Sequence, residues 1–213
     1  LRSWSDERLA GLLSARPGYG WLSEETVDDG SRLTAPRSFV IDPMDGTRAF
    51  IKGKPHFTVS IAVVEEGRPV AGAIFNPITE EMFEAALGSG ARLNGQAIRP
   101  SAKQAFDGAR LLGDPHLSRD LIRDGASVES RNSIAYRIAL VAAGQFDASV
   151  SPRPKSDWDL AAADIIMSEA GGLLTDHSGR VYRYNTDTVQ CAPPLAAGPA
   201  LHALLRDRLQ NTP

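Results

Sequence analysis

The sequence predicts a mixed α/β (α+β) fold organised around an antiparallel meander and two strong helices. Residues 57–86 alternate apolar and polar side chains in three runs separated by short turns, which is typical of antiparallel strands with one covered face. Residues 132–143 and 157–170 carry apolar side chains at helical spacing, and a glycine follows each segment. Because the apolar face of a sheet needs a cover, we expect helices to cover one face of the meander.

The other elements follow in chain order from local patterns. A short amphipathic helix is predicted over 6–15, because three leucines share one face and Pro17-Gly18 ends the segment. A buried strand over 39–41 and a brief helical turn over 48–50 precede the meander. The meander strands cover 57–65, 69–75 and 81–86, and the later elements are a hairpin and loop over 87–95, a strand over 110–112, a helix over 116–123, a strand over 146–150 and a helix over 199–209.

The composition excludes several classes of protein. The 213-residue chain is 42% apolar and 23% charged, with a net charge of −3, as in an ordinary globular protein. Lys and Arg are isolated rather than clustered, and no apolar run approaches the ~20 residues that span a bilayer. Cys191 is the single cysteine, which rules out an internal disulfide and fits a reducing cytoplasm. We therefore expect a cytoplasmic protein that binds neither nucleic acid directly nor a membrane.

A turn with two aspartates follows the first predicted buried strand. Pro43 has no N–H to donate, so we expect the strand to stop at Asp42. Asp42 and Asp45 can then face one point in space, and a hard cation such as Mg²⁺ prefers such oxygen ligands. The backbone amides of Gly46 and Thr47 would suit an anion at the same turn. Asp-Pro and Asp-Gly are also ordinary turn dipeptides, so the turn alone leaves a surface loop as the alternative.

Two further acidic positions complete the candidate set. Glu24 and Glu25 are adjacent acids, which are usually solvated, but beside a dication one can ligate while the other orients a water. Asp159 lies in the first turn of the 157–170 helix, where an acid also stabilises the helix dipole. Asp157 is the predicted N-cap, which leaves Asp159 available as an inward-facing ligand.

Together, these segments resemble the inositol monophosphatase family of Mg²⁺-dependent, lithium-sensitive phosphomonoesterases. The matching motifs are Glu24-Glu25, Asp42-Pro-Met-Asp-Gly-Thr47, and Trp158-Asp-Leu-Ala-Ala-Ala-Asp running on to Glu169-Ala-Gly-Gly172. The resemblance covers nearly the whole chain. It implies a layered α/β/α/β/α sugar-phosphatase fold, two or three Mg²⁺ ions, and hydrolysis of a small phosphate monoester by a metal-activated water. We expect residues 1–100 to carry the metal site and residues 101–213 to close the substrate pocket.

The resemblance also implies a set of metal ligands. Glu24 would ligate a metal and help to activate the attacking water. Asp42 would bridge two metals, and the backbone carbonyl of Met44 would ligate the first of them. Asp45 and Asp159 would complete the second metal site. Four converging carboxylates would repel one another strongly without cations, so we expect the site to be incomplete without metal.

The same resemblance implies the contacts to the substrate. Thr47 would hydrogen-bond the attacking water, which makes it a catalytic candidate beside the Glu24 and Asp45 carboxylates. The amides of Gly46 and Thr47 would hold the phosphate, with Arg48 following them at the substrate. Two residues fall where the family lines its substrate pocket, namely Ser133 and Ala135.

The chain departs from the family where the substrate is read. Seven residues before Asp159 the family has a glutamate that contacts sugar hydroxyls, whereas this chain has Pro152 followed by Arg153. An arginine there would suit a second anionic group, and a solvated loop residue is the equal alternative. Residues 46–51 look more like the bacterial 3′(2′),5′-bisphosphate nucleotidase branch. The 158–164 motif is shared by several branches, including histidinol-phosphate phosphatases, so the substrate is left open.

A role of a different class also follows from the resemblance. Some family members resemble regulators associated with RNA polymerase, which bind a partner independently of catalysis. The complete acid set favours an enzyme. The family also places a first helix and a lysine-bearing loop before the 6–15 helix, and such a helix commonly builds dimers, so a homodimer is a further expectation.

Overall fold

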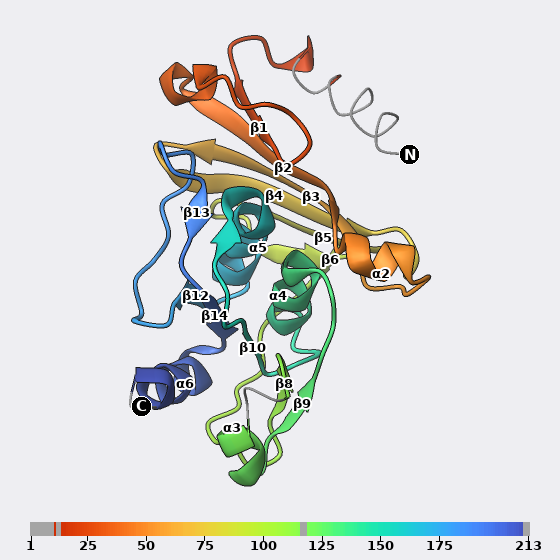
Figure 1. Cartoon of the computed structure of the whole chain (residues 1–213), viewed down its shortest axis with the longest axis vertical. Coiled ribbons are helices and arrows are strands. Elements are labelled where there is room, and N and C mark those ends of the chain that lie inside the picture. Colours follow the sequence, from red (N-terminus) through yellow and green to blue (C-terminus); the bar gives the residue numbers. More distant parts are fainter. Residues whose placement is uncertain (1–10, 12–13, 116–118, 211–213) are drawn as a thin grey trace.

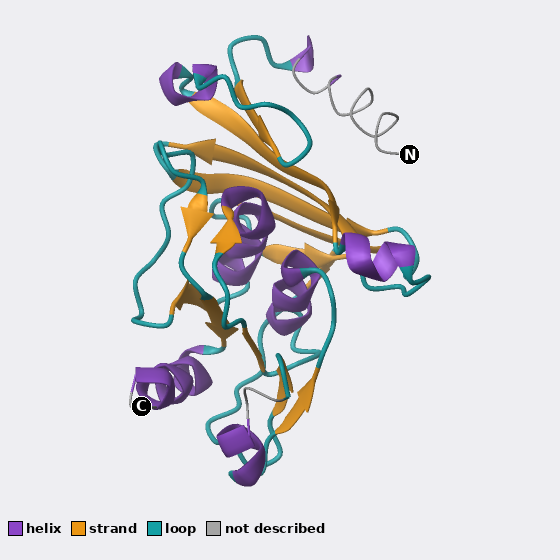
Figure 2. Ribbon diagram, viewed as in Figure 1, coloured by secondary structure: helices purple, strands orange, loops and turns teal. Residues whose placement is uncertain are grey.

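The structure is a computed structural model, and it describes residues 11, 14–115 and 119–210 of the chain. Two helices, α4 (Ile134–Ala142) and α5 (Asp157–Glu169), lie between a larger and a smaller sheet (Figure 1). The terminal helix α6 (Pro199–Gln210) and the short helix α3 (Arg119–Arg123) lie beyond the smaller sheet (Figure 2). The predicted mixed, layered fold is therefore confirmed.

The larger sheet has seven strands whose order in space is their order in the chain. Its first two strands pair in parallel, and every later neighbour is antiparallel, so the predicted meander is confirmed. The strands are β1 (Gly20–Ser23), β2 (Arg37–Asp45), β3 (Thr58–Glu65), β4 (Arg68–Asn76), β5 (Glu81–Ala86), β6 (Ala91–Leu93) and β7 (Gln96–Ala97).

The smaller sheet is mixed, with five strands from the second half of the chain. In spatial order they are β12 (Leu173–Asp176), β14 (Pro194–Ala197), β10 (Ala148–Val150), β8 (Arg110–Leu112) and β9 (Ser127–Glu129). The remaining elements are the antiparallel pair β11 (Lys155–Ser156) and β13 (Gln190–Cys191), the 3-10 helix η1 (Ser31–Thr34) and the short helix α2 (Thr47–Ile51).

Small residues bring α5 directly onto the larger sheet. Ala161, Ala162 and Ala163 are buried, and a Cβ at Gly72 of β4 would lie 2.6 Å from Ile165 Cγ2 and 2.9 Å from the Ala162 carbonyl. A side chain at this position would force the helix away from the sheet. The second half of the chain thus shares one core with the first, and the predicted boundary near residue 100 stays a prediction.

One sequence prediction is wrong in the larger sheet. The first strand does not stop at Asp42: β2 pairs with β3 at Asp42–Ser60 and again at Asp45–Thr58, with a shift of register between them. This bulge carries one extra residue. Pro43 is tolerated there because the ladder is interrupted and requires no backbone N–H donor at that position. The segment over 87–95 is the predicted hairpin and loop, in which the short strand β6 pairs antiparallel with β5.

The other predicted elements agree with the structure to within a few residues. The strand over 146–150 is shorter, as β10, and the helix over 116–123 is described from Arg119 onward. Most of the predicted 6–15 helix lies outside the described residues. The three residues of this range that are described, 11, 14 and 15, are helical. Within the described ranges, none of the helices has the length and apolar character needed to cross a bilayer.

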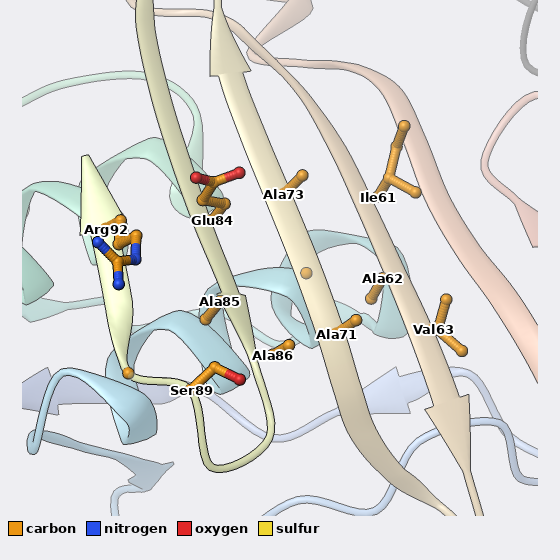
Figure 3. A pocket seen from close by; sticks show the side chains of 12 residues that line it. Ile61, Ala62, Val63, Ala71, Ala73, Glu84, Ala85, Ala86, Ser89 and Arg92 are labelled. Atoms are coloured by element: carbon orange, nitrogen blue, oxygen red, sulfur yellow. The ribbon is translucent and has the colours of Figure 1, made fainter. Parts of the chain in front are cut away.

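The outer face of the larger sheet, opposite α4 and α5, carries an apolar hollow of about 370 Å³. Ile61, Val63 and Ala73 line it beside the cross-strand pair of Glu84 and Arg92 (Figure 3). None of the predicted site residues lines this hollow, so the chemistry expected from the sequence lies elsewhere.

Asp164 of α5 makes the stability of this fold depend on pH. Its half-buried carboxylate accepts a 2.8 Å hydrogen bond from the Tyr184 hydroxyl. Burial raises the pKa of Asp164 from 3.8 to about 6, although the Tyr184 bond opposes the shift. The folded state binds the proton on Asp164 more tightly than the unfolded state does, so protonation of Asp164 stabilises the fold. This stabilisation is complete below about pH 4 and is lost as the pH rises through about 6.

We therefore expect the stability of the Asp164→Asn variant, relative to wild type, to be higher at neutral pH than at acidic pH. Relative to wild type, its free energy of unfolding should rise by roughly 2 kcal/mol between about pH 4 and about pH 7.5. Urea denaturation of both proteins at the two pH values measures this difference. An equal difference at both values would contradict the assignment of a raised pKa to Asp164.

Candidate metal centre and active site

Three aspartates from two elements meet at one point. Asp42 and Asp45 flank the bulge at the end of β2, and Asp159 lies in the first turn of α5. One carboxylate oxygen from each lies within 4.8 Å of the others. The bulge matters here because it lets two residues of one strand direct their side chains to the same side.

Asp45 is held by the beginning of α4. Its Oδ2 accepts a 2.8 Å hydrogen bond from the Ser133 hydroxyl and another of 2.8 Å from the Ala135 amide. Asp45 is only 7% exposed. The start of a helix stabilises an anion, so α4 compensates for the burial of this carboxylate.

Asp42 lies beside Glu24 because β1 and β2 run in parallel. Ser23 pairs with Ile41, and the next residue along each strand is Glu24 or Asp42. The Asp42 Oδ1 accepts a 2.8 Å hydrogen bond from the Met44 amide, and its carboxyl lies within hydrogen-bonding reach of the Glu24 carboxyl. Asp42 is buried and Glu24 is exposed, so Glu24 forms the solvent side of the cluster.

The predicted cap of α5 is wrong. Ser156 is the N-cap, and its amide donates a 2.7 Å hydrogen bond to Asp159 Oδ2. Asp157 instead accepts from the Asn185 amide at 2.6 Å and from the Cys191 thiol at 3.4 Å. The sequence pattern could not show this, because the partners of Asp157 are about 30 residues away. Asp159 therefore both caps the helix and faces the other aspartates.

Burial and mutual repulsion act against the ionised form of this cluster. Burial is the largest cause that raises the pKa of Asp42, followed by the charges of Asp45 and Glu24. Burial also raises the pKa of Asp45, followed by the charge of Asp159, while the Ser133 and Ala135 hydrogen bonds oppose the rise. For Asp159 the cause is burial, opposed by the Ser156 amide and by Lys155. The cluster is short of positive charge.

A divalent cation with oxygen ligands fits this donor set. The converging atoms are all carboxylate oxygens, no thiol or imidazole is among them, and two of the three residues are buried. Mg²⁺ prefers such hard ligands and keeps waters in its remaining positions. A cation would also offset the repulsion that the aspartates experience on their own.

The turn after Asp45 brings Thr47 and Met44 together. The Thr47 hydroxyl donates a 3.2 Å hydrogen bond to the Met44 carbonyl, so this carbonyl and the hydroxyl lie on the same side of the turn. Gly46 has φ 94° and precedes α2, on which Arg48 is exposed. A Cβ at Gly46 would lie 2.7 Å from the His56 carbonyl, so the turn can close only on glycine.

The structure does not bring Arg153 into this cluster. Arg153 is exposed, and its guanidinium forms no ion pair with the described residues; its backbone carbonyl accepts from the Ser151 hydroxyl at 3.4 Å. Two neighbours that sequence reasoning missed are Lys155, whose charge acts on Asp45 and Asp159, and Thr58, which pairs with Asp45 in the sheet. Lys155 precedes Asp159 by four residues, which is the one sequence signal that could have suggested it.

Comparisons with known proteins identify the family of the chain. The model of the inositol monophosphatase family matches residues 5–211. An inositol-1-monophosphatase of Rhizobium meliloti is 37% identical over 180 residues, which cover 79% of this chain and 67% of that protein. The Nus factor SuhB of Pseudomonas aeruginosa is 37% identical over 187 residues, which cover 80% of this chain and 68% of that protein.

Solved structures show the same fold. A crystal structure of the extragenic suppressor protein SuhB from Bartonella henselae superimposes with a TM-score of 0.87 at 30% sequence identity, covering 99% of this chain and 87% of that one. The inositol monophosphatase of Anabaena superimposes with a TM-score of 0.82 at 27% identity, covering 96% and 83% of the two chains. The chain therefore belongs to the inositol monophosphatase family of phosphomonoesterases.

Proposed function

We propose that this protein hydrolyses a small phosphate monoester in a Mg²⁺-dependent reaction. The observation that carries the proposal is the convergence of Asp42, Asp45 and Asp159, with an oxygen of each within 4.8 Å of the others. Their burial favours a resident cation over a solvated acidic surface, because buried carboxylates need a counter-charge.

The residues proposed to hold two or three Mg²⁺ ions are Glu24, Asp42, the Met44 carbonyl, Asp45 and Asp159. When bound, such a pair of cations lowers the pKa of a coordinated water and offsets charge on the attacking and departing oxygens of the phosphate. The protein contributes the fixed positions of the ligands: two flank a bulge, one begins a helix and one follows a parallel strand.

The remaining chemistry is assigned to residues around the β2 turn. Glu24, on the solvent side, is proposed to accept a proton from the attacking water. The Thr47 hydroxyl donates to the Met44 carbonyl, so its oxygen can accept a hydrogen bond from that water and orient it. The amides of Gly46 and Thr47 are proposed to bind the phosphate oxygens, as hydrogen-bond donors fixed by the turn.

The proposed substrate is an inositol phosphate, because relatives that are 35–37% identical are named inositol-1-monophosphatase. The resemblance gives Arg48, Ser133, Ala135 and Arg153 as the substrate contacts; for this chain Arg48, Ala135 and Arg153 are the residues proposed to surround the substrate, because the Ser133 hydroxyl donates to Asp45. A 3′(2′),5′-bisphosphate nucleotide and histidinol phosphate are the alternatives that the sequence motifs leave open. Inhibition by lithium, a cytoplasmic location and a homodimer complete the proposal.

The test is phosphate release from four substrates with and without Mg²⁺. Inositol 1-phosphate, adenosine 3′,5′-bisphosphate, fructose 1,6-bisphosphate and histidinol phosphate distinguish the branches. We expect turnover only with Mg²⁺, and fastest on inositol 1-phosphate. Faster turnover of the bisphosphate nucleotide would move the assignment to that branch, and no turnover of any substrate by metal-loaded protein would overturn the enzymatic proposal.

A second candidate is a non-catalytic role in which the protein binds a macromolecular partner. The observation that favours it is that several relatives, 35–38% identical, are named Nus factor SuhB. The two roles can be distinguished with a variant that keeps the protein surface and disables the acidic cluster. Asp45→Asn is such a variant, because it changes one buried carboxylate.

A further inference from the structure

Ser133 has an unusual backbone and a crowded hydroxyl. It caps α4 with φ 59° and ψ 103°, in the region that residues with side chains rarely adopt, and it is only 5% exposed. Its Oγ lies 2.8 Å from Asp45 Oδ2, 3.0 Å from the Tyr136 amide nitrogen and 3.0 Å from Thr58 Oγ1. Such strain persists only where the surrounding structure holds it in place.

The direction of every proton in this cluster follows from the donors and acceptors. An ionised Asp45 can only accept, so the single hydroxyl proton of Ser133 points to Asp45. The Tyr136 amide can only donate, so it points to Ser133. With its proton committed, Ser133 must accept from Thr58, and the hydroxyls form a chain from Thr58 through Ser133 to Asp45.

This arrangement saturates the Ser133 hydroxyl. A serine oxygen has one proton and two lone pairs, and Asp45, Tyr136 and Thr58 take all three. No capacity is left for a hydroxyl or phosphate of a substrate. Among the described residues, the hydrogen bonds to Asp45 fall on Oδ2, from Ser133 and Ala135, which leaves Oδ1 to face a cation.

We propose that Ser133 is a positioning residue, which holds the Asp45 carboxylate in the orientation that binds the cation and does not contact the substrate. The inference rests on the proposed Mg²⁺ site. The hydrogen-bond chain through Ser133 links the two halves of the fold, because Thr58 and Asp45 are paired residues of the larger sheet and Ser133 caps the start of α4. The strained backbone is what directs the Ser133 hydroxyl to the sheet while Ala135 reaches the same oxygen.

The test measures Mg²⁺ binding by isothermal titration calorimetry in the absence of substrate. Ser133→Gly removes the hydroxyl and its hydrogen bonds, but it relieves the positive φ and places a residue that helix N-caps tolerate, so we expect it to fold. Ser133→Ala removes the hydroxyl and keeps the strain. Partners that orient a metal ligand typically contribute 10–100-fold to affinity, so we expect both variants to bind Mg²⁺ about tenfold more weakly or worse. At saturating Mg²⁺ the KM for the substrate should stay within about twofold of wild type.

Variants of Thr58 provide the matched controls. Thr58→Ser keeps the donor and should bind Mg²⁺ like wild type, whereas Thr58→Val keeps the shape and removes the donor, and should weaken binding by less than Ser133→Gly. In an Asp45→Asn background, Ser133→Gly should cause no further loss, because residues that act through one another are not additive.

Each outcome distinguishes this inference from the proposed function. If wild-type protein binds no Mg²⁺, the proposed function fails. If wild type binds Mg²⁺ and Ser133→Gly binds it equally well, the positioning role fails. A Ser133→Gly variant with unchanged Mg²⁺ affinity and a raised KM would assign Ser133 to the substrate pocket and overturn the inference.

Discussion

Replacing Asp45 by asparagine is expected to lower Mg²⁺-dependent phosphate release by at least about a thousandfold, which corresponds to about 4 kcal/mol of transition-state stabilisation. Asparagine keeps an oxygen that can accept from Ser133 and Ala135, so the hydrogen bonds that hold α4 can survive. It removes the negative charge that the proposed cation needs. The measurement is kcat/KM on the preferred substrate, together with calorimetric binding of Mg²⁺.

Stability provides a second measurement on the same variant. Asp45 is buried beside Asp159, and the charges of the cluster oppose one another. Without metal, the Asp45→Asn protein should therefore melt no lower than wild type, since the substitution removes repulsion. Asp187→Asn, a change of an exposed aspartate outside the cluster, is the control and should leave both turnover and melting unchanged.

The Asp45→Asn result also separates the two candidate functions. Near-normal turnover in the variant would contradict the assignment of the active site. A variant that loses turnover and yet retains the biological function of the protein would place the binding of a macromolecular partner first. Loss of both together supports catalysis as the function.

Gly46→Ala is expected to have the second large effect, because the turn leaves no room for a side chain. The added Cβ would lie 2.7 Å from the His56 carbonyl, 3.1 Å from Phe57 Cα and 3.1 Å from Ser133 Cβ, and φ is 94°. Two of these neighbours are backbone atoms that cannot rotate away. We expect a loss of about 3 kcal/mol or more in the free energy of unfolding, of which about 1 kcal/mol is the cost of the positive φ.

Turnover by the Gly46→Ala variant should also fall, for a reason that is separate from its loss of stability. Gly46 follows Asp45 directly, so a shift of about 1 Å in the turn displaces the carboxylate, and misplacement on this scale costs roughly a hundredfold in rate. Urea denaturation and kcat/KM at saturating Mg²⁺ measure the two effects.

Gly53 is the matched control for this substitution. It also has a positive φ, 63°, but nothing lies within 4 Å of an added Cβ. Gly53→Ala should therefore cost only about 1 kcal/mol and leave turnover near that of wild type. If Gly46→Ala behaved like Gly53→Ala, the close approach of β2, the 56–57 segment and α4 would not be a requirement of the site.

Much of the fold followed from the sequence because its signals are local. The alternation over 57–86 predicted β3, β4 and β5 to within a residue or two, and the helical spacing over 157–170 predicted α5. The resemblance of three motifs, in their order along the chain, predicted the family, which the family match over residues 5–211 confirms. The acids of the candidate site were named for the same reason: the Asp42–Thr47 turn and the start of α5 are continuous segments.

The rest was decided by contacts between distant residues, which leave no local pattern. A bulge, set by pairing with β3, carries β2 past Pro43 to Asp45, and the partner of Asp157 is Asn185. From the sequence, the resemblance predicted only that Ser133 lines the substrate pocket. The tertiary structure places it between Thr58 and Asp45, because the start of α4 packs against the end of β2, and packing alone determines which polar groups meet.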